Sequence, residues 1–131
     1  MSGITNPDDF RACVPEEPEH DAPDGRAVLL NVLADQIHKN AVDKGFWEND
    51  RNNGECIALA HSELSEALEA LRKGNPPDHH CPEFDNATVE FADCIIRILD
   101  LCGAREMPIG EALIAKMRFN ATRPHKHGKE F

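Results

Sequence analysis

The stretch Glu63-Leu64-Ser65-Glu66 has a counterpart further along the chain in Glu90-Phe91-Ala92-Asp93. Each stretch places two carboxylates three residues apart in a segment with helical periodicity, so both lie on one helix face with Cβ atoms roughly 5–6 Å apart. Two negative charges this close repel each other, and a divalent cation between them relieves the repulsion. The two stretches therefore predict two neighbouring helices whose acids together enclose a metal ion.

Four segments have the apolar spacing of amphipathic helices, and no segment requires a β-strand. The expected helices span approximately residues 27–44, 54–73, 87–101 and 108–122. Gly103 is expected to end the third helix, because glycine commonly follows the last helical residue. The pattern predicts an all-α fold resembling a four-helix bundle.

Within the second expected helix, the main apolar stripe is expected to form the core: it comprises Ile57, Ala60, Leu64, Ala67, Leu68 and Leu71. The third expected helix is apolar around most of its circumference, and its polar strip comprises Glu90, Asp93, Arg97 and Asp100. Four short helices offer too little cover for such a helix. Burial between subunits is therefore expected.

Length and composition limit the classes of function. The chain has 131 residues, enough for one domain with a core. Residues 1–25 are rich in proline and acids and predict a flexible arm, which leaves residues 26–131 as the folded domain. Acids outnumber bases 24 to 14, and the formal net charge of −10 argues against nucleic acid polymers and anionic membranes as partners.

The cysteines and the hydropathy pattern concern the compartment. The five cysteines are odd in number and lack the spacing of a disulfide framework or a structural zinc site, so a reducing environment is expected. Neither a secretory signal pattern nor an apolar segment of bilayer length occurs in the sequence. The expected location is the cytoplasm.

The four motif acids, Glu63, Glu66, Glu90 and Asp93, are the candidate catalytic residues and metal ligands. Carboxylate oxygens suit Mg²⁺, with Mn²⁺ as a substitute, whereas imidazole and thiolate ligands are missing from the motif. Such ions bridge phosphate oxygens and acidify bound water. The expected cofactor is therefore Mg²⁺, and the expected chemistry is the handling of phosphate.

Five further residues are candidates for substrate binding. Lys116, Asn120 and Arg123 follow one another along one edge of the last expected helix, and Lys126 comes shortly after it. These side chains offer charge and hydrogen bonds to phosphates. Trp47 either stacks on a nucleobase or packs in the core. Together the groups predict a nucleotide hydrolase without a P-loop.

At this point the chain resembles the MazG-type all-α nucleoside triphosphate pyrophosphohydrolases, whose signature is EExxE followed by ExxD. The resemblance rests on the four motif acids and covers roughly residues 27–131. It extends to Lys44-Gly45-Phe46-Trp47, to the stretch from Leu68 to Gly74, and to the stretches Lys116 to Asn120 and Arg123 to Lys129. It implies hydrolysis of a (d)NTP to the (d)NMP and diphosphate in a nucleotide-pool housecleaning role. It also implies a homodimer or homotetramer with sites near subunit interfaces.

The sequence departs from that signature at Ser62, which replaces the first acid of EExxE, so the general base is unassigned. This departure favours an alternative function, a catalytically weak nucleotide-binding sensor or scaffold. A third alternative, a helical dimerisation module, leaves the four acids unexplained. The run His79-His80-Cys81 suggests zinc, but adjacent histidines lack the spacing of a structural zinc site.

Overall fold

The computed structural model describes residues 22–131, so most of the expected arm, residues 1–25, lies outside the described part of the chain. The elements are α1 (Gly25–Asp43), α2 (Asn53–Arg72), α3 (Asn86–Ala104), α4 (Ile109–Ala121) and the 3-10 helix η2 (His125–Gly128). The described residues form no β-strand, and a single isolated bridge joins Pro77 to Asp85. The all-α prediction is confirmed.

Side-chain caps explain where the first three helices begin. Asp24 accepts a hydrogen bond from the backbone N–H of Arg26, Asn52 accepts from the N–H of Gly54, and Asp85 accepts from that of Thr88. Each cap satisfies a backbone donor that has no partner inside its helix. The helix starts are therefore set by local sequence.

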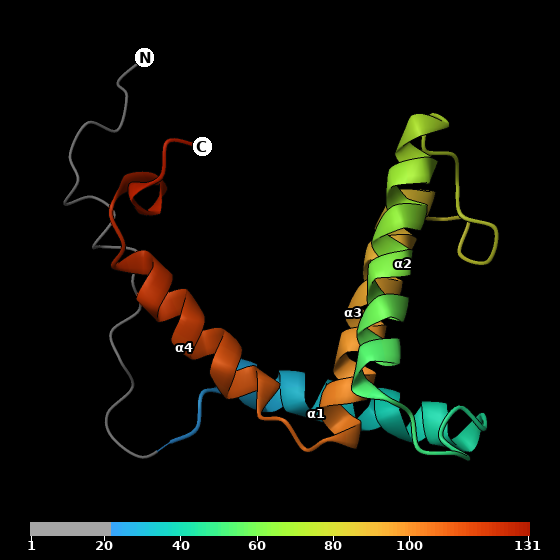
Figure 1. Ribbon diagram of the computed structural model, residues 1–131, viewed down its shortest axis with the longest axis horizontal. Helices are drawn as coiled ribbons and strands as arrows, with labels where there is room; N and C mark the ends of the chain where they lie inside the picture. Colours follow the sequence, from blue (N-terminus) through green and yellow to red (C-terminus); the bar gives the residue numbers. More distant parts are fainter. Residues whose placement is uncertain (1–21) are drawn as a thin grey trace.

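The helices form two arms rather than a closed bundle (Figure 1). Helices α2 and α3 lie side by side along their length, and α1 packs across α3 at one end of this pair. Helix α4 packs on α1 and extends away from α2 and α3. The α2–α3 pair and α4 are thus joined through α1.

Gly103 does not end the third helix, and this prediction is wrong. Helix α3 continues to Ala104, with Arg105 as its C-cap. A Cβ atom on Gly103 would lie 2.8 Å from the backbone oxygen of Ala34 and equally close to the Cβ of His38. The glycine is therefore explained by the close approach of α1 to α3, because any side chain would push the two helices apart.

The expected core stripe of α2 is only partly correct. Its small members are buried, but its four large members are about half exposed: Ile57 51%, Leu64 46%, Leu68 51% and Leu71 52%. The buried face of α2, here called the small-residue face, consists of Cys56, Ala60, Glu63, Ala67 and Ala70. Periodicity identified an apolar side of the helix but not the side that packs on α3.

The rest of the core also consists mainly of small side chains, and among the described residues no large side chain is fully buried. Large apolar residues on α1 and α3, such as Leu29, Phe91 and Ile95, are 47–60% exposed.

None of the helices in residues 22–131 has the length and hydropathy needed to cross a bilayer.

Candidate metal centre

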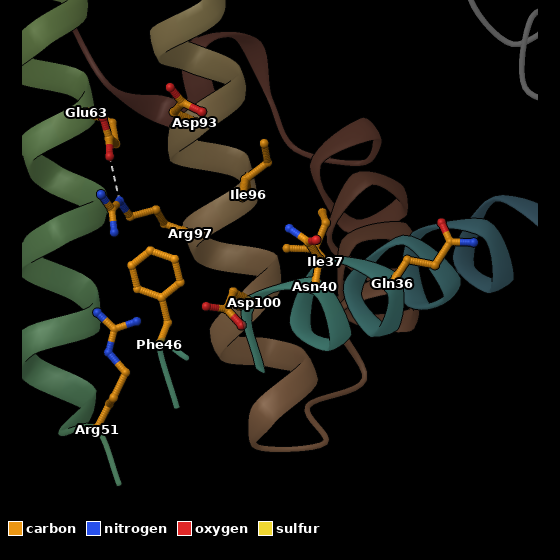
Figure 2. A pocket seen from close by; sticks show the side chains of 11 residues that line it. Gln36, Ile37, Asn40, Phe46, Arg51, Glu63, Asp93, Ile96, Arg97 and Asp100 are labelled. Atoms are coloured by element: carbon orange, nitrogen blue, oxygen red, sulfur yellow. Dashed lines mark hydrogen bonds and ion pairs between the residues drawn. The ribbon is translucent and has the colours of Figure 1, made fainter. Parts of the chain in front are cut away.

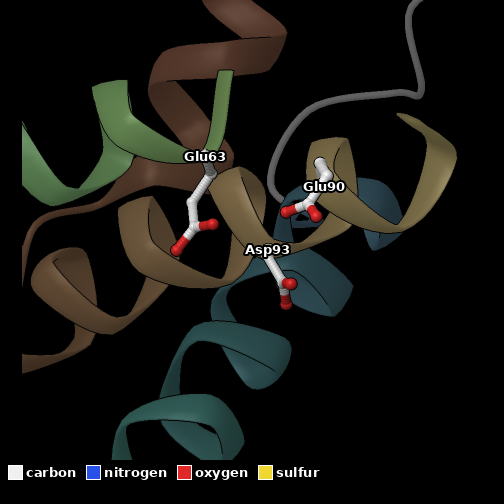
Figure 3. Close-up of side chains that lie close together, drawn as sticks. All are labelled: Glu63, Glu90 and Asp93. Carbon is white, nitrogen blue, oxygen red and sulfur yellow. The ribbon is translucent and has the colours of Figure 1, made fainter. Parts of the chain in front are cut away.

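Three acids from two helices come together to form the acid cluster, Glu63, Glu90 and Asp93 (Figure 3). Each offers a carboxylate oxygen, and these oxygens lie within 4.8 Å of one another. Glu63 belongs to the small-residue face of α2 and is only 6% exposed, because the small side chains of that face bring the backbone of α2 close to α3. Glu90 and Asp93 face it from α3 and are partly exposed.

The electrostatics of the acid cluster favour a bound cation. Burial raises the pKa of Glu90, and the Asp93 and Glu63 carboxylates raise it further. Burial and the Glu63 carboxylate likewise raise the pKa of Asp93. Burial first, and then the neighbouring carboxylates, thus disfavour the ionised forms of Glu90 and Asp93. All the donors are carboxylate oxygens, so the set fits a hard divalent cation.

Glu66, the fourth predicted ligand, lies outside this group of three. It is exposed on α2, whereas Glu63 is buried. A hydrogen bond with Glu63 and, to a lesser degree, burial raise the pKa of Glu66, so the two carboxyl groups interact. Glu66 therefore lies beside the acid cluster, on its solvent side.

Arg97 forms an ion pair with Glu63. Its Nε donates to Glu63 Oε1 at 2.5 Å across the α2–α3 interface. Burial acts to raise the pKa of Glu63, but hydrogen bonds, above all from Arg97, outweigh it and hold this pKa below its ordinary value. Glu63 is therefore the acid of the cluster most strongly kept ionised.

A cavity of about 460 Å³ adjoins the acid cluster (Figure 2). Its walls come from α1, the α1–α2 loop, α2 and α3, and its lining residues are Gln36, Ile37, Asn40, Ala41, Phe46, Arg51, Glu63, Asp93, Ile96, Arg97 and Asp100. Two acids of the cluster, Glu63 and Asp93, thus line a cavity whose walls contain both apolar and polar side chains. Such a lining is typical of small-molecule sites.

Several of these lining residues were not singled out in the sequence. Gln36 and Asn40 lie on the first helix, and Arg51 lies in the loop before α2. Each is separated from the acids of α3 by 39 or more positions in the chain, so no local spacing links them. Phe46 is the sequence neighbour of Trp47, and the structure shows that Phe46, which is 61% exposed, is the one that lines the cavity.

Trp47 packs beside the cavity and is not among its lining residues. Its Nε1 donates to both carboxylate oxygens of Asp100, at 3.0 and 3.1 Å, and His38 Nδ1 lies 2.9 Å from Asp100 Oδ1. The guanidinium carbons of Arg51 and Arg105 lie 5.4 and 5.7 Å from the centroid of its ring. This geometry fits the packing alternative for Trp47, and it makes Asp100 a buried hydrogen-bond acceptor rather than a surface charge.

The C-terminal set, Lys116, Asn120, Arg123 and Lys126, lies on α4 or just beyond it, on the other arm of the molecule (Figure 1). None of the four lines the cavity. Lys116 Nζ and the Arg123 guanidinium carbon lie 4.8 and 5.6 Å from the ring centroid of Phe119. Within one chain, the structure does not bring this set to the acid cluster.

Two other sequence features take no part in the cluster. Ser62 is exposed, and its hydroxyl donates to the carbonyl of Leu59, so it bonds to its own helix. His79, His80 and Cys81 are exposed in the α2–α3 loop. Within residues 22–131, the acid cluster is the group of His, Cys, Asp or Glu side chains with the geometry to hold a metal, and it includes neither histidine.

Comparisons with known proteins leave the family open. No family model matches the chain, and neither a curated protein nor a solved structure does so.

Proposed function

We propose that this protein is a Mg²⁺-dependent nucleoside triphosphate pyrophosphohydrolase of the MazG type, which converts a (d)NTP and water to the (d)NMP and diphosphate. The observation that carries the proposal is the acid cluster, whose carboxylate oxygens lie within 4.8 Å of one another at the wall of a cavity of about 460 Å³. A cavity of this volume matches the size of small-molecule sites. Housecleaning of the nucleotide pool is the corresponding cellular role.

Glu63, Glu90 and Asp93 would hold the cation, and Glu66, which interacts with Glu63, would lie beside them. Mg²⁺, or Mn²⁺ in its place, supplies charge neutralisation at phosphate oxygens and an acidified water. The protein side chains orient the carboxylates: the small-residue face of α2 presents Glu63, and one turn of α3 presents Glu90 and Asp93 together. The hydrogen bond from Arg97 helps to keep Glu63 ionised.

The cavity would hold the nucleoside. Phe46 offers an exposed aromatic face for stacking, and the Gln36 and Asn40 amides offer both donors and acceptors to the edge of a base. Trp47 donates hydrogen bonds to Asp100, which lines the same cavity. In this proposal, Phe46 and the two amides recognise the base, and Trp47 has a supporting role.

A second copy of the chain would complete the site, so the functional form would be a homodimer or a homotetramer. The large apolar side chains of α2 are about half exposed, as are Phe91 and Ile95 on α3, and burying them between copies removes apolar area from water. The same association would allow the C-terminal set of one copy to approach the acid cluster of another. In this proposal, the separation of the two groups within one chain is overcome by association of two copies.

Product identity tests the proposal. Purified protein with Mg²⁺ and a panel of NTPs and dNTPs is expected to release diphosphate and a monophosphate, and EDTA is expected to abolish the reaction. Glu90→Gln removes one cluster carboxylate and is expected to lower kcat/KM by about 100-fold or more. The matched control is Glu69→Gln, because Glu69 lies on the exposed side of α2 and pairs only with Lys73 among the described residues; its activity is expected to match wild type.

Other results would contradict the assignment in distinct ways. Release of orthophosphate alone would place the cleavage at another phosphoanhydride bond. Nucleotide binding without turnover, insensitive to Glu90→Gln, would support the sensor or scaffold alternative.

A further inference from the structure

Arg97 lies at the boundary between the acid cluster and the cavity. Its side chain reaches from α3 toward Glu63, and it lines the cavity together with Asp93 and Asp100 (Figure 2). The Arg97 side chain is 36% exposed, whereas that of Glu63 is 7% exposed. A fixed positive charge therefore lies between the proposed cation site and the space proposed for the nucleotide.

The ion pair uses a small part of the hydrogen-bonding capacity of this arginine. A guanidinium carries five N–H donors in a planar fork. Of the five donors of Arg97, only the Nε–H donates to an acceptor within the described residues, and that acceptor is Glu63 Oε1. The terminal nitrogens thus remain available to a ligand in the cavity, and their geometry matches two oxygens of one phosphate group.

Glu63 has two competing roles. It is the partner of Arg97, and it is also one of the three acids that could hold a metal. A divalent cation at Glu63 attracts the same carboxylate and repels the guanidinium, so the ion pair is weaker when the metal is bound. The two positive groups cannot both keep Glu63 as a full partner.

We propose that Arg97 is a phosphate-binding residue whose availability is coupled to the metal. In the absence of metal it neutralises Glu63. When a cation binds the acid cluster, Arg97 releases Glu63, and its guanidinium binds non-bridging oxygens of the phosphoryl group nearest the cluster. This inference rests on the proposed function and deepens it, because it makes metal and nucleotide bind cooperatively through one side chain.

The competing explanation is that Arg97 only stabilises the buried Glu63 carboxylate. The two explanations differ in the sign of one effect. If Arg97 competes with the cation, its removal tightens metal binding in the absence of nucleotide and weakens nucleotide binding in the presence of metal. If Arg97 is merely structural, its removal disorders Glu63 and weakens both.

The test uses the full chain and the variant Arg97→Gln at pH 8. Mn²⁺ affinity without nucleotide is measured from the electron paramagnetic resonance of free Mn²⁺, and it is expected to tighten about threefold to tenfold because a repelling charge is removed. Binding of an α,β-imido dNTP at saturating Mn²⁺, measured by calorimetry, is expected to weaken about tenfold or more. The matched control is Arg72→Gln at the exposed end of α2, which is expected to change neither constant.

Arg97→Lys keeps the charge but not the planar fork, so Mn²⁺ affinity is expected to stay near wild type while analogue binding weakens severalfold. This variant decides the question if circular dichroism shows that Arg97→Gln does not fold. Weaker or unchanged Mn²⁺ binding by Arg97→Gln, or unchanged analogue binding by both variants, would overturn the role of Arg97 alone. A wild-type protein that binds no Mn²⁺ would overturn both this inference and the proposed function.

Discussion

The two long faces of α2 differ in what they bury. The small-residue face packs on α3 and contains Ala67, which is 1% exposed, together with the buried Glu63. The adjacent apolar face, formed by Ile57, Leu64, Leu68 and Leu71, remains about half exposed. In most amphipathic helices the large apolar residues form the internal contact. In this protein they remain about half exposed, and the internal contact is made by small side chains.

This difference explains the position of the acid cluster. Small side chains allow two helix backbones to approach closely, so a carboxylate on that face lies between the helices and loses contact with water. Glu63 is in that position, whereas Glu66 and Glu69, on the same helix, are exposed. The two faces therefore separate acids that are close in sequence into buried and solvated groups.

The largest expected effect comes from placing a charge on each face in turn. Ala67→Glu buries an unpaired carboxylate between α2 and α3, so we expect a loss of more than about 4 kcal/mol and no cooperative unfolding transition. Leu68→Glu, one residue away on the exposed face, is expected to keep the helical circular dichroism of the wild type at low temperature. Its mass in light scattering is expected to fall to that of one chain. An unchanged mass would show that this face is not a subunit interface.

A smaller effect is expected where helices touch through glycine. A Cβ atom on Gly110 would lie 2.1 Å from the backbone oxygen of Ala27. Gly110→Ala must therefore separate α1 from α4, and we expect a loss of about 2–3 kcal/mol of unfolding free energy, measured by urea titration. Gly25→Ala is the matched control, because a Cβ atom there meets nothing within 4 Å. Equal stability of the two variants would contradict the close contact.

The local parts of the fold were predictable from sequence, and the pairing of faces was not. Helix starts depend on caps such as Asp24 and Asn52, which act within three residues. The side of α2 that packs on α3 depends on the shape of both helices, so the periodicity that includes Leu64 could not identify it. Three of the four motif acids were correctly expected to converge, because their spacing places them on facing helices.

Long-range contacts within the site show the same limit. Arg97 pairs with Glu63, which is 34 positions away in the chain, and the spacing of residues along α3 does not indicate this partner. Likewise, the hydrogen bonds of Trp47 and His38 to Asp100 join segments with no common local pattern. Spacing reveals neighbours on one helix, whereas these contacts depend on how α1, α2 and α3 pack.

The smallest expected effect concerns the charge held within the acid cluster. The pKa of Asp93 is raised first by burial and then by Glu63, so ionisation of Asp93 destabilises the metal-free fold. The stabilising contribution of its protonated form is complete below the unfolded pKa and is lost as the pH rises through the raised folded pKa. In EDTA, Asp93→Asn is therefore expected to melt about 2–5 °C above wild type at pH 8 and at nearly the same temperature at pH 3.5.

Scanning calorimetry across that pH range, with and without Mg²⁺, measures this difference. Mg²⁺ is expected to raise the melting temperature of the wild type but not of the variant, because the variant lacks one carboxylate. A gap in melting temperature that narrows as the pH rises would have the wrong sign and would contradict the proposed repulsion.

The close contact between Ala27 and Gly110 also holds the N-terminal end of α4 against α1. Asn31 fastens that end, since its side chain accepts a hydrogen bond from the Gly110 N–H and donates to Glu111. Helix α4 has 13 residues, which corresponds to a length of about 20 Å. A rotation of α4 by about 10° about its N-terminal end would displace its C-terminal end by roughly 3 Å. The close contact at Gly110 therefore influences where Arg123 and Lys126, which follow α4, are positioned.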